Sequence, residues 1–223
     1  MAEQQSIEEA LAILESDAKD LVSVCVKMVE AYDGAVYPFD LFANGAANRT
    51  LALSKGFRQM IRDRNLICAG AILRLQLDTA FRFYAGFLVP DPHKFAMDVF
   101  DGVQIRNIVD MNGKKMSDRY LVNKLSTEFP WVDELYKKTC DYIHLSGTHM
   151  SHAIDGHDKK SFTAKISETD GDLPDHVYLS AIMAFQQSTI IFVRYLNGWI
   201  YTKANPEEML RLKAERDAEK SAT

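Results

Sequence analysis

The chain has 223 residues, of which 47% are hydrophobic and 26% are charged, and its formal net charge is −5. These values are typical of a soluble globular protein, and a chain of this length buries enough surface to fold without disulfide staples. The acidic balance disfavours nucleic acid as a partner, because broad nucleic-acid binding needs a basic face. We therefore expect one domain.

Cysteine usage and the first residues bear on the compartment. Cys25, Cys68 and Cys140 are far apart, and no Cys-x-x-Cys pair is present. The sequence therefore predicts neither a disulfide framework nor a cysteine zinc site. Residues 1–6 lack the basic and apolar regions of a signal peptide. These patterns predict a cytoplasmic protein.

The most apolar run near the C-terminus is Val177–Ile200. It contains polar or charged side chains at Gln186, Gln187, Arg194 and Asn197, whereas a membrane span needs about 20 predominantly apolar residues. We therefore expect a core helix and no membrane partner.

Three helices are predicted in the first part of the chain. Ser6 and Glu9 form a capping-box pattern before a helix from about Ile7 to Tyr32, whose apolar seam favours lengthwise packing on another helix. A second helix is expected from Ala46 to Arg64. A third, from Leu66 to Val89, is apolar on most of its circumference and so belongs in the middle of a bundle.

A small β excursion is predicted between the helices. Asp91 caps a further helix that has Pro92 in its first position. Residues 103–116 contain an apolar run followed by Asn112-Gly113, which is a hairpin signal. Residues 160–167 alternate in polarity like one short strand, which we expect to pair with that hairpin.

The remaining segments read as helices. One starts at Ser117-Asp118, the next at Pro130, and a long core helix spans Pro174 to about Lys203. Asn205-Pro206 caps a last, highly charged helix from Glu207 to Lys220. The predicted class is mainly α: a single-domain helical bundle over residues 1–204, with the β excursion at about 103–116 and 160–167, and a charged C-terminal helix or tail at 205–223.

Arg74, Asp78 and Arg82 are four residues apart in succession, so they form one stripe on an otherwise apolar helix. Two arginines around one carboxylate leave a positive charge. If the stripe is buried, it needs an anionic ligand or another acidic side chain, because unpaired buried charge is costly. The alternative is a solvent-facing ladder of salt bridges.

The segment from Asp141 to His152 is the densest in reactive side chains. Among its residues, His149 and His152 are spaced to share a helix face with Asp155, which is the ligand set of a zinc or iron site. Glycines interrupt the helix, and no His-Glu-x-x-His pattern is present. We expect no metal and no cofactor, and favour structural histidines at a helix end, where the helix dipole stabilises them.

Catalysis is a further hypothesis for this segment. Ser146 lies near His144 or His149 and near carboxylates, but no Gly-x-Ser-x-Gly pattern surrounds it, so a serine triad is disfavoured. General acid–base work by His144 or His149 is favoured over it, with Arg74 or Arg82 holding a phosphate.

The order of these motifs resembles a loosely defined group of uncharacterised bacterial all-helical proteins. They carry an arginine-plus-acid helix followed by a Tyr…Ser…His segment, and the similarity covers about residues 66–152. It implies a helical fold and no particular activity. The matching motifs are Arg74-x-x-x-Asp78 and Tyr142-x-x-Leu145-Ser146-x-x-His149.

More distantly, the number of helices is similar to that of the HEPN class of helical domains, many of which are RNases of toxin and phage-defence systems. Those enzymes use an Arg-x(4–6)-His motif. No arginine stands at that spacing before His144, His149, His152 or His157, which removes the main reason to expect RNase activity.

Three functions therefore remain open. The favoured one is a binding module for a small anionic ligand, with a nucleotide among the candidates. The alternatives are a HEPN-like RNase or defence effector, and a non-enzymatic oligomeric scaffold in which the helix seams join subunits. We expect a homo-oligomer, most simply a dimer. The predicted ligand pocket is lined by Arg74, Asp78, Arg82, Tyr142, Ser146 and His149.

Overall fold

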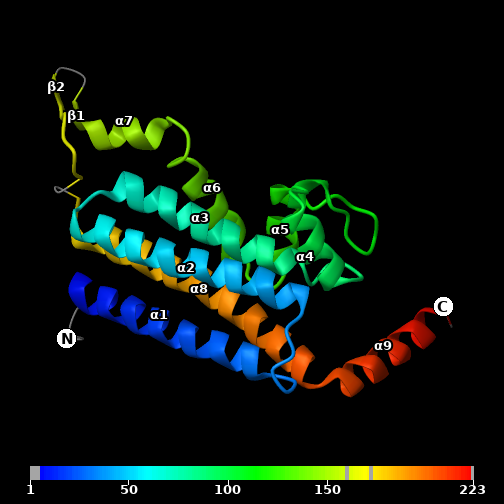
Figure 1. The fold of residues 1–223 in the computed structure, drawn as a ribbon. Helices are drawn as coiled ribbons and strands as arrows, with labels where there is room; N and C mark the ends of the chain where they lie inside the picture. Colours follow the sequence, from blue (N-terminus) through cyan, green and yellow to red (C-terminus); the bar gives the residue numbers. More distant parts are fainter. Residues whose placement is uncertain (1–5, 159–160, 171–172, 222–223) are drawn as a thin grey trace.

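The computed structural model describes residues 6–158, 161–170 and 173–221. Four long helices lie side by side within these ranges (Figure 1). Both α1 and α3 pack against α2 and against α8, so the four helices close into a bundle. The predicted mainly α class is confirmed. The bundle helices are α1 (Ile7–Glu30), α2 (Pro38–Arg62), α3 (Leu66–Ala85) and α8 (Asp175–Ala204).

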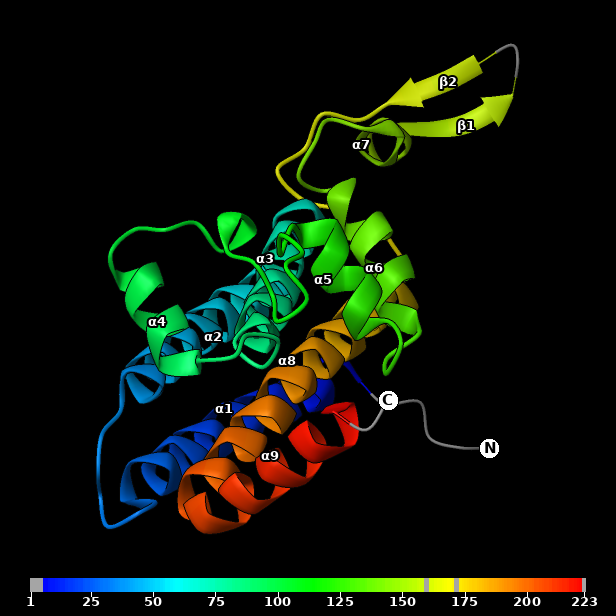
Figure 2. The same cartoon turned by 90° about the vertical axis from the view of Figure 1, so that its right-hand side faces the viewer.

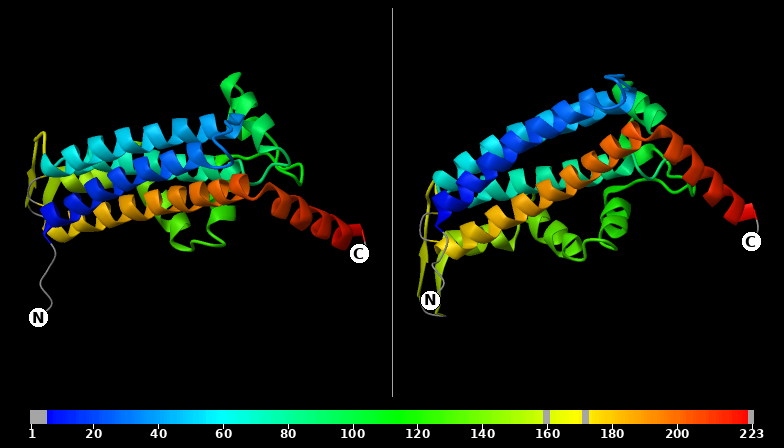
Figure 3. Two further views of the ribbon diagram at one scale, coloured as in Figure 1. Left: turned by 60° about the horizontal axis from the view of Figure 1, so that its bottom comes forward. Right: turned by 90° about the horizontal axis from the view of Figure 1, so that it is seen from below.

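In the bundle α1, α3 and α8 run in one direction and α2 runs back (Figures 1 and 3). Because α3 and α8 are parallel neighbours, the chain between them must return along the bundle. Short elements make this return: α4 covers part of α2, whereas α5 and α6 lie on α3. They are α4 (Pro92–Phe100), the 3-10 turn η1 (Ile105–Asn107), α5 (Asp118–Leu125), α6 (Trp131–Cys140) and α7 (Gly147–Ala153).

Two excursions leave the bundle at opposite ends. The antiparallel hairpin of β1 (Ile154–Asp158) and β2 (Ser161–Ala164) projects with α7 beyond one end (Figure 2). At the other end α9 (Pro206–Ser221) continues past α8 and away from the packed helices (Figure 3). The sequence of this last helix is highly charged, which agrees with its position outside the core.

The second helix begins earlier than the predicted Ala46. It starts at Pro38, whose fixed backbone suits the first helical position. The Asp40 carboxylate accepts the Tyr37 backbone N–H at 2.8 Å and so satisfies a group that the helix leaves unpaired. Residues 38–45, which precede the predicted start of the helix, are therefore part of α2. The third helix, which is predicted to reach Val89, ends at Ala85 in α3.

The predicted hairpin at 103–116 is wrong in its extent. Its first part is the turn η1, and the only pairing described there is an isolated bridge between Val109 and Lys115. The Asp110 side chain accepts the backbone N–H groups of Asn112 and Lys114, which holds the chain in a turn rather than in extended strands. The strand β2 pairs instead with its chain neighbour β1.

This Asp110 turn carries a prediction about pH. Burial disfavours ionisation of Asp110, but the Tyr120 hydroxyl at 2.5 Å and the two backbone N–H groups outweigh it and lower the carboxyl pKa to about 2. Because the pKa of Asp110 is lower in the folded state than in the unfolded state, ionised Asp110 stabilises the fold at pH values above its ordinary pKa. This stability is lost as the pH falls from about 4 towards 2.

We therefore expect Tyr120→Phe to be less stable than the parent at pH 7 and to lose less stability on acidification. Urea midpoints measured from pH 7 to pH 2 check this, with Tyr201→Phe, which removes an exposed hydroxyl bonded to Glu208, as the control. A constant gap between Tyr120→Phe and the parent over this range would contradict the role of Asp110.

A buried ion pair closes the α9 end of the bundle. The Lys203 ammonium donates to the Met28 carbonyl at 2.7 Å and lies 3.0 Å from Asp40, with both charged side chains at most 4% exposed. The Trp199 indole N–H also donates to Asp40, at 2.6 Å. One cluster thus joins α8 to the end of α1 and the start of α2.

Within the described ranges, α8 is the one helix that is long and apolar enough to cross a membrane by length and composition. The core helix of a soluble bundle meets the same test. α8 packs against α1 and α3, which buries part of its apolar surface. Gln186, near the middle of the helix, donates to Asp17 of α1 at 2.8 Å.

Candidate functional site

A network of charged side chains surrounds Asp78 on α3. Arg82 donates to Asp78 through Nε and to Asp118 through Nη2, both at 2.7 Å. Arg49 of α2 lies 3.4 Å from the second Asp78 oxygen. Arg74 is more distant, at 4.0 Å from Asp78 and 3.8 Å from Asp118. These described groups are three guanidiniums and two carboxylates, so the network carries one net positive charge.

Arg74 is held by aromatic rings rather than by short ion pairs. It is 9% exposed, and its guanidinium carbon lies 4.4 Å from the ring centre of Tyr136 and 5.4 Å from that of Phe81. Such contacts stabilise a partly desolvated cation. The solvent-facing alternative is therefore wrong for Arg74. Asp118, which lies 2.7 Å from Arg82 and 3.8 Å from Arg74, is a further acidic side chain beside the stripe.

A depression of about 320 Å³ opens beside this network, between α2, α3 and α4. Its polar lining consists of Arg49, Asp78, Arg82 and Thr79, and most of its other walls are apolar. Pockets that combine an apolar wall with a few placed polar groups are the common form of small-molecule site. The ion network therefore borders a cavity that is suited to a ligand with a charged end.

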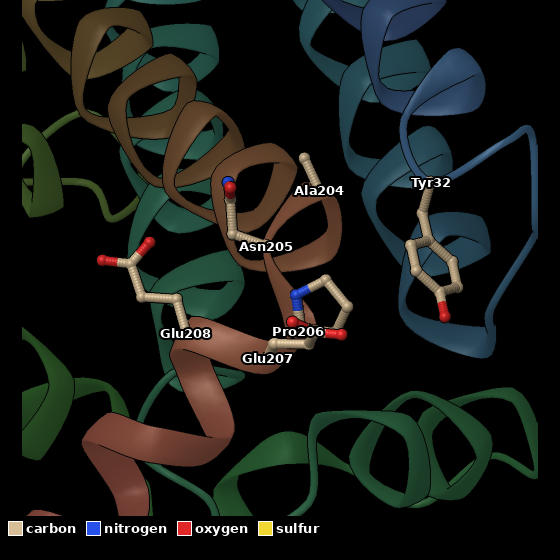
Figure 4. A pocket seen from close by; sticks show the side chains of 6 residues that line it. All are labelled: Tyr32, Ala204, Asn205, Pro206, Glu207 and Glu208. Atoms are coloured by element: carbon tan, nitrogen blue, oxygen red, sulfur yellow. The ribbon is translucent and has the colours of Figure 1, made fainter.

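A larger depression, of about 420 Å³, lies at the turn between α8 and α9. Figure 4 shows Tyr32 of the α1 end facing Pro206 across it, with Glu207 and Glu208 beside the turn. Its charged lining is acidic, and Glu208 already accepts the Tyr201 hydroxyl. We favour the smaller depression as the site, because it combines apolar walls with Arg49 and Arg82, whereas the charged lining of the larger one is acidic only.

In the histidine segment, Ser146 and His149 cap a helix. The Ser146 hydroxyl accepts the Thr148 backbone N–H at 3.3 Å, and the Ser146 backbone N–H lies 3.2 Å from His149 Nδ1. In this capping box His149 Nδ1 accepts the Ser146 backbone N–H. The structure places this histidine at a helix end, but not at the end where the helix dipole favours a cation. It lies at the N-terminal end of α7, where the helix dipole disfavours a cation.

The capping contacts also bear on catalysis. Ser146 Oγ and His149 Nδ1 are 3.4 Å apart. The Ser146 hydroxyl, however, donates to the Asp141 backbone carbonyl at 3.0 Å. The groups that would serve as nucleophile and base are therefore engaged in helix capping. His144 is exposed on the preceding turn, so the two candidate bases lie on different elements.

The predicted metal ligands are split between two elements. His149 and His152 belong to α7, whereas Asp155 belongs to β1, so the continuous helix that would align all three is wrong. The side chains of His152 and Asp155 lie outside the described part. Among the described residues, no group of three histidine, cysteine or acidic side chains is placed to hold a metal.

Tyr142 connects the histidine segment to α3. Its ring lies directly over Gly70, one helical turn before Arg74, and leaves no room there for a Cβ atom. His149 meets the Tyr142 ring edge-on, with centres 6.4 Å apart. Burial raises the pKa of the Tyr142 hydroxyl. The described contacts thus bring Tyr142 to the face of α3 that bears Arg74, with His149 on the Tyr142 side.

The depression and the predicted pocket share only part of their residues. Asp78 and Arg82 line the depression, and Arg74 lies behind them in the same network. Tyr142, Ser146 and His149 form the separate α6–α7 group. Sequence reasoning missed Arg49 and Asp118; the charge imbalance of the stripe indicates that an acid is needed, but it does not indicate which one.

In comparisons with known proteins, no protein-family model matches the chain, and no matching curated protein or solved structure was found.

Proposed function

We propose that this protein binds a small anionic ligand in the depression between α2, α3 and α4. One observation carries the proposal: an apolar cavity is bordered by Arg49 and Arg82, which belong to a network with more guanidiniums than carboxylates. An anion placed there neutralises the remaining positive charge. The low polarity of the walls strengthens that attraction.

Arg49 is the group best placed to take the ligand's charge. Its side chain is 47% exposed, and its one described ion pair, with Asp78, is long at 3.4 Å. By contrast, Arg82 already uses two nitrogens in short bonds to carboxylates. Arg49 can therefore turn to a ligand at little cost, while Arg82 and Asp78 keep the wall in place.

We expect Arg49→Gln to weaken anion binding by roughly tenfold or more, because hydrogen bonds to charged groups contribute about 1.5–3 kcal/mol. Isothermal titration calorimetry with octanoate, inorganic phosphate and AMP as probes measures this. Arg62→Gln is the matched control: Arg62 is on the same helix, is 41% exposed and has one 3.3 Å ion pair. Equal loss in both variants, or no binding of any probe to the parent, would overturn the proposal.

The three cysteines are unpaired. Together with the cysteine spacing, this supports a reducing cytoplasm as the compartment. RNA cleavage receives less support, since the His149 Nδ1 atom serves the α7 cap and the charged network lies on other elements.

A further inference from the structure

We propose that the ligand is a monocarboxylate with a compact apolar body, and that Gly45 of α2 provides the space for that body. The inference rests on the proposed function and adds the chemical class of the ligand. It follows from the charge of the network, the lining of the depression and the size of the depression.

The charge of the network favours a single negative charge on the ligand. The described guanidiniums of Arg49, Arg74 and Arg82 exceed the carboxylates of Asp78 and Asp118 by one. A monocarboxylate balances this excess, whereas a phosphate dianion leaves a negative charge beside two aspartates. Planar carboxylates also match the geometry of a guanidinium.

The walls away from the charges are built for hydrocarbon. Phe83 and Ile105 form buried parts of the lining. At the rim, Leu41 and Phe100 are 51% and 57% exposed, so two large apolar side chains meet water around the opening. An apolar ligand body covers these surfaces, which a sugar or a polar base does not.

The size of the depression limits the ligand further. About 320 Å³ lies at the lower end of small-molecule pockets. A carboxylate of about ten to fifteen non-hydrogen atoms fits such a space.

Gly45 lines this depression from within α2. A Cβ atom placed on it meets no other atom within 4 Å, so packing does not require glycine, and its backbone is helical rather than left-handed. Glycine inside a helix is destabilising. The residue thus weakens α2 without a packing reason, and what it provides is space at the wall of the cavity.

The experiment replaces Gly45 by leucine and measures octanoate and AMP binding by calorimetry, together with thermal unfolding. We expect octanoate to bind the parent at least about tenfold more tightly than AMP. Gly45→Leu should weaken octanoate binding by about tenfold or more while leaving the melting temperature equal or higher, since leucine favours helix. Gly198→Leu is the matched control: Gly198 is inside α8, and its Cβ also meets open space.

The outcomes separate this inference from the proposed function. If AMP or phosphate binds in an Arg49-dependent manner and octanoate does not, the ligand class is wrong and the anion site stands. If octanoate binding depends on Arg49 but is the same in Gly45→Leu and Gly198→Leu, the role of Gly45 is wrong. If none of the probes binds the parent protein, both proposals fail together.

Discussion

Lys203→Met is expected to lower the free energy of unfolding by about 3–5 kcal/mol, the usual cost of removing one partner of a buried ion pair. The methionine fills similar space but leaves the Asp40 carboxylate, which is 4% exposed, without its cation. It also leaves the Met28 carbonyl at the end of α1 without its 2.7 Å donor. The loss comes from uncompensated desolvation rather than from lost packing.

Guanidinium denaturation checks this through the midpoint, provided that the slope of the transition is unchanged. Lys19→Met is the control, since Lys19 is 78% exposed on α1 and its pair with Glu15 is long at 3.7 Å; it should change stability by less than about 0.5 kcal/mol. A Lys203→Met variant as stable as the control would mean that Trp199 and the Tyr37 backbone N–H alone satisfy Asp40.

Arg82→Met is expected to cost about 2–4 kcal/mol, more than Arg74→Leu at about 1 kcal/mol. Arg82 makes both 2.7 Å bonds of the network and so ties Asp118, at the start of α5, to α3. Its loss leaves Asp78 and Asp118 with arginines no closer than 3.4 Å. Partial exposure of these groups keeps the cost below that of a fully buried pair.

In Arg74→Leu both carboxylates keep Arg82, and the leucine still packs against the Phe81 and Tyr136 rings. Urea midpoints of the two variants, measured side by side, test the order. The reverse order would show that the aromatic contacts of Arg74, and not the bonds of Arg82, hold α5 and α6 on α3.

Local patterns were sufficient for most of the helices. Ser6 caps α1, Asp91 caps α4 and Ser117 caps α5, each by accepting backbone N–H groups of its own first turn. These contacts are between residues two or three apart, so their chemistry is complete within the sequence segment. The Pro38 start of α2 is locally encoded as well, because the fixed backbone of proline suits the first helical position.

Local sequence patterns do not specify which strands pair when the segments are far apart in the chain. The strand at 161–164 was expected to join residues 103–116, but the shorter loop to β1 decided its partner, since closing a short loop costs less entropy than closing a long one. In residues 103–116, the Asp110 side chain accepts the backbone N–H groups of Asn112 and Lys114, which favours a turn over strand pairing.

For the candidate site, the sequence by itself determined the stripe of Arg74, Asp78 and Arg82 and its unbalanced positive charge, because helical periodicity aligns residues four apart. Only the tertiary structure decided that Asp118 and Arg49 join the stripe and that a cavity opens beside it. Both depend on how the crossover from α4 to α6 packs on α2 and α3. A helix pattern specifies which face is polar, but the partner of that face is set by packing between segments far apart in the chain.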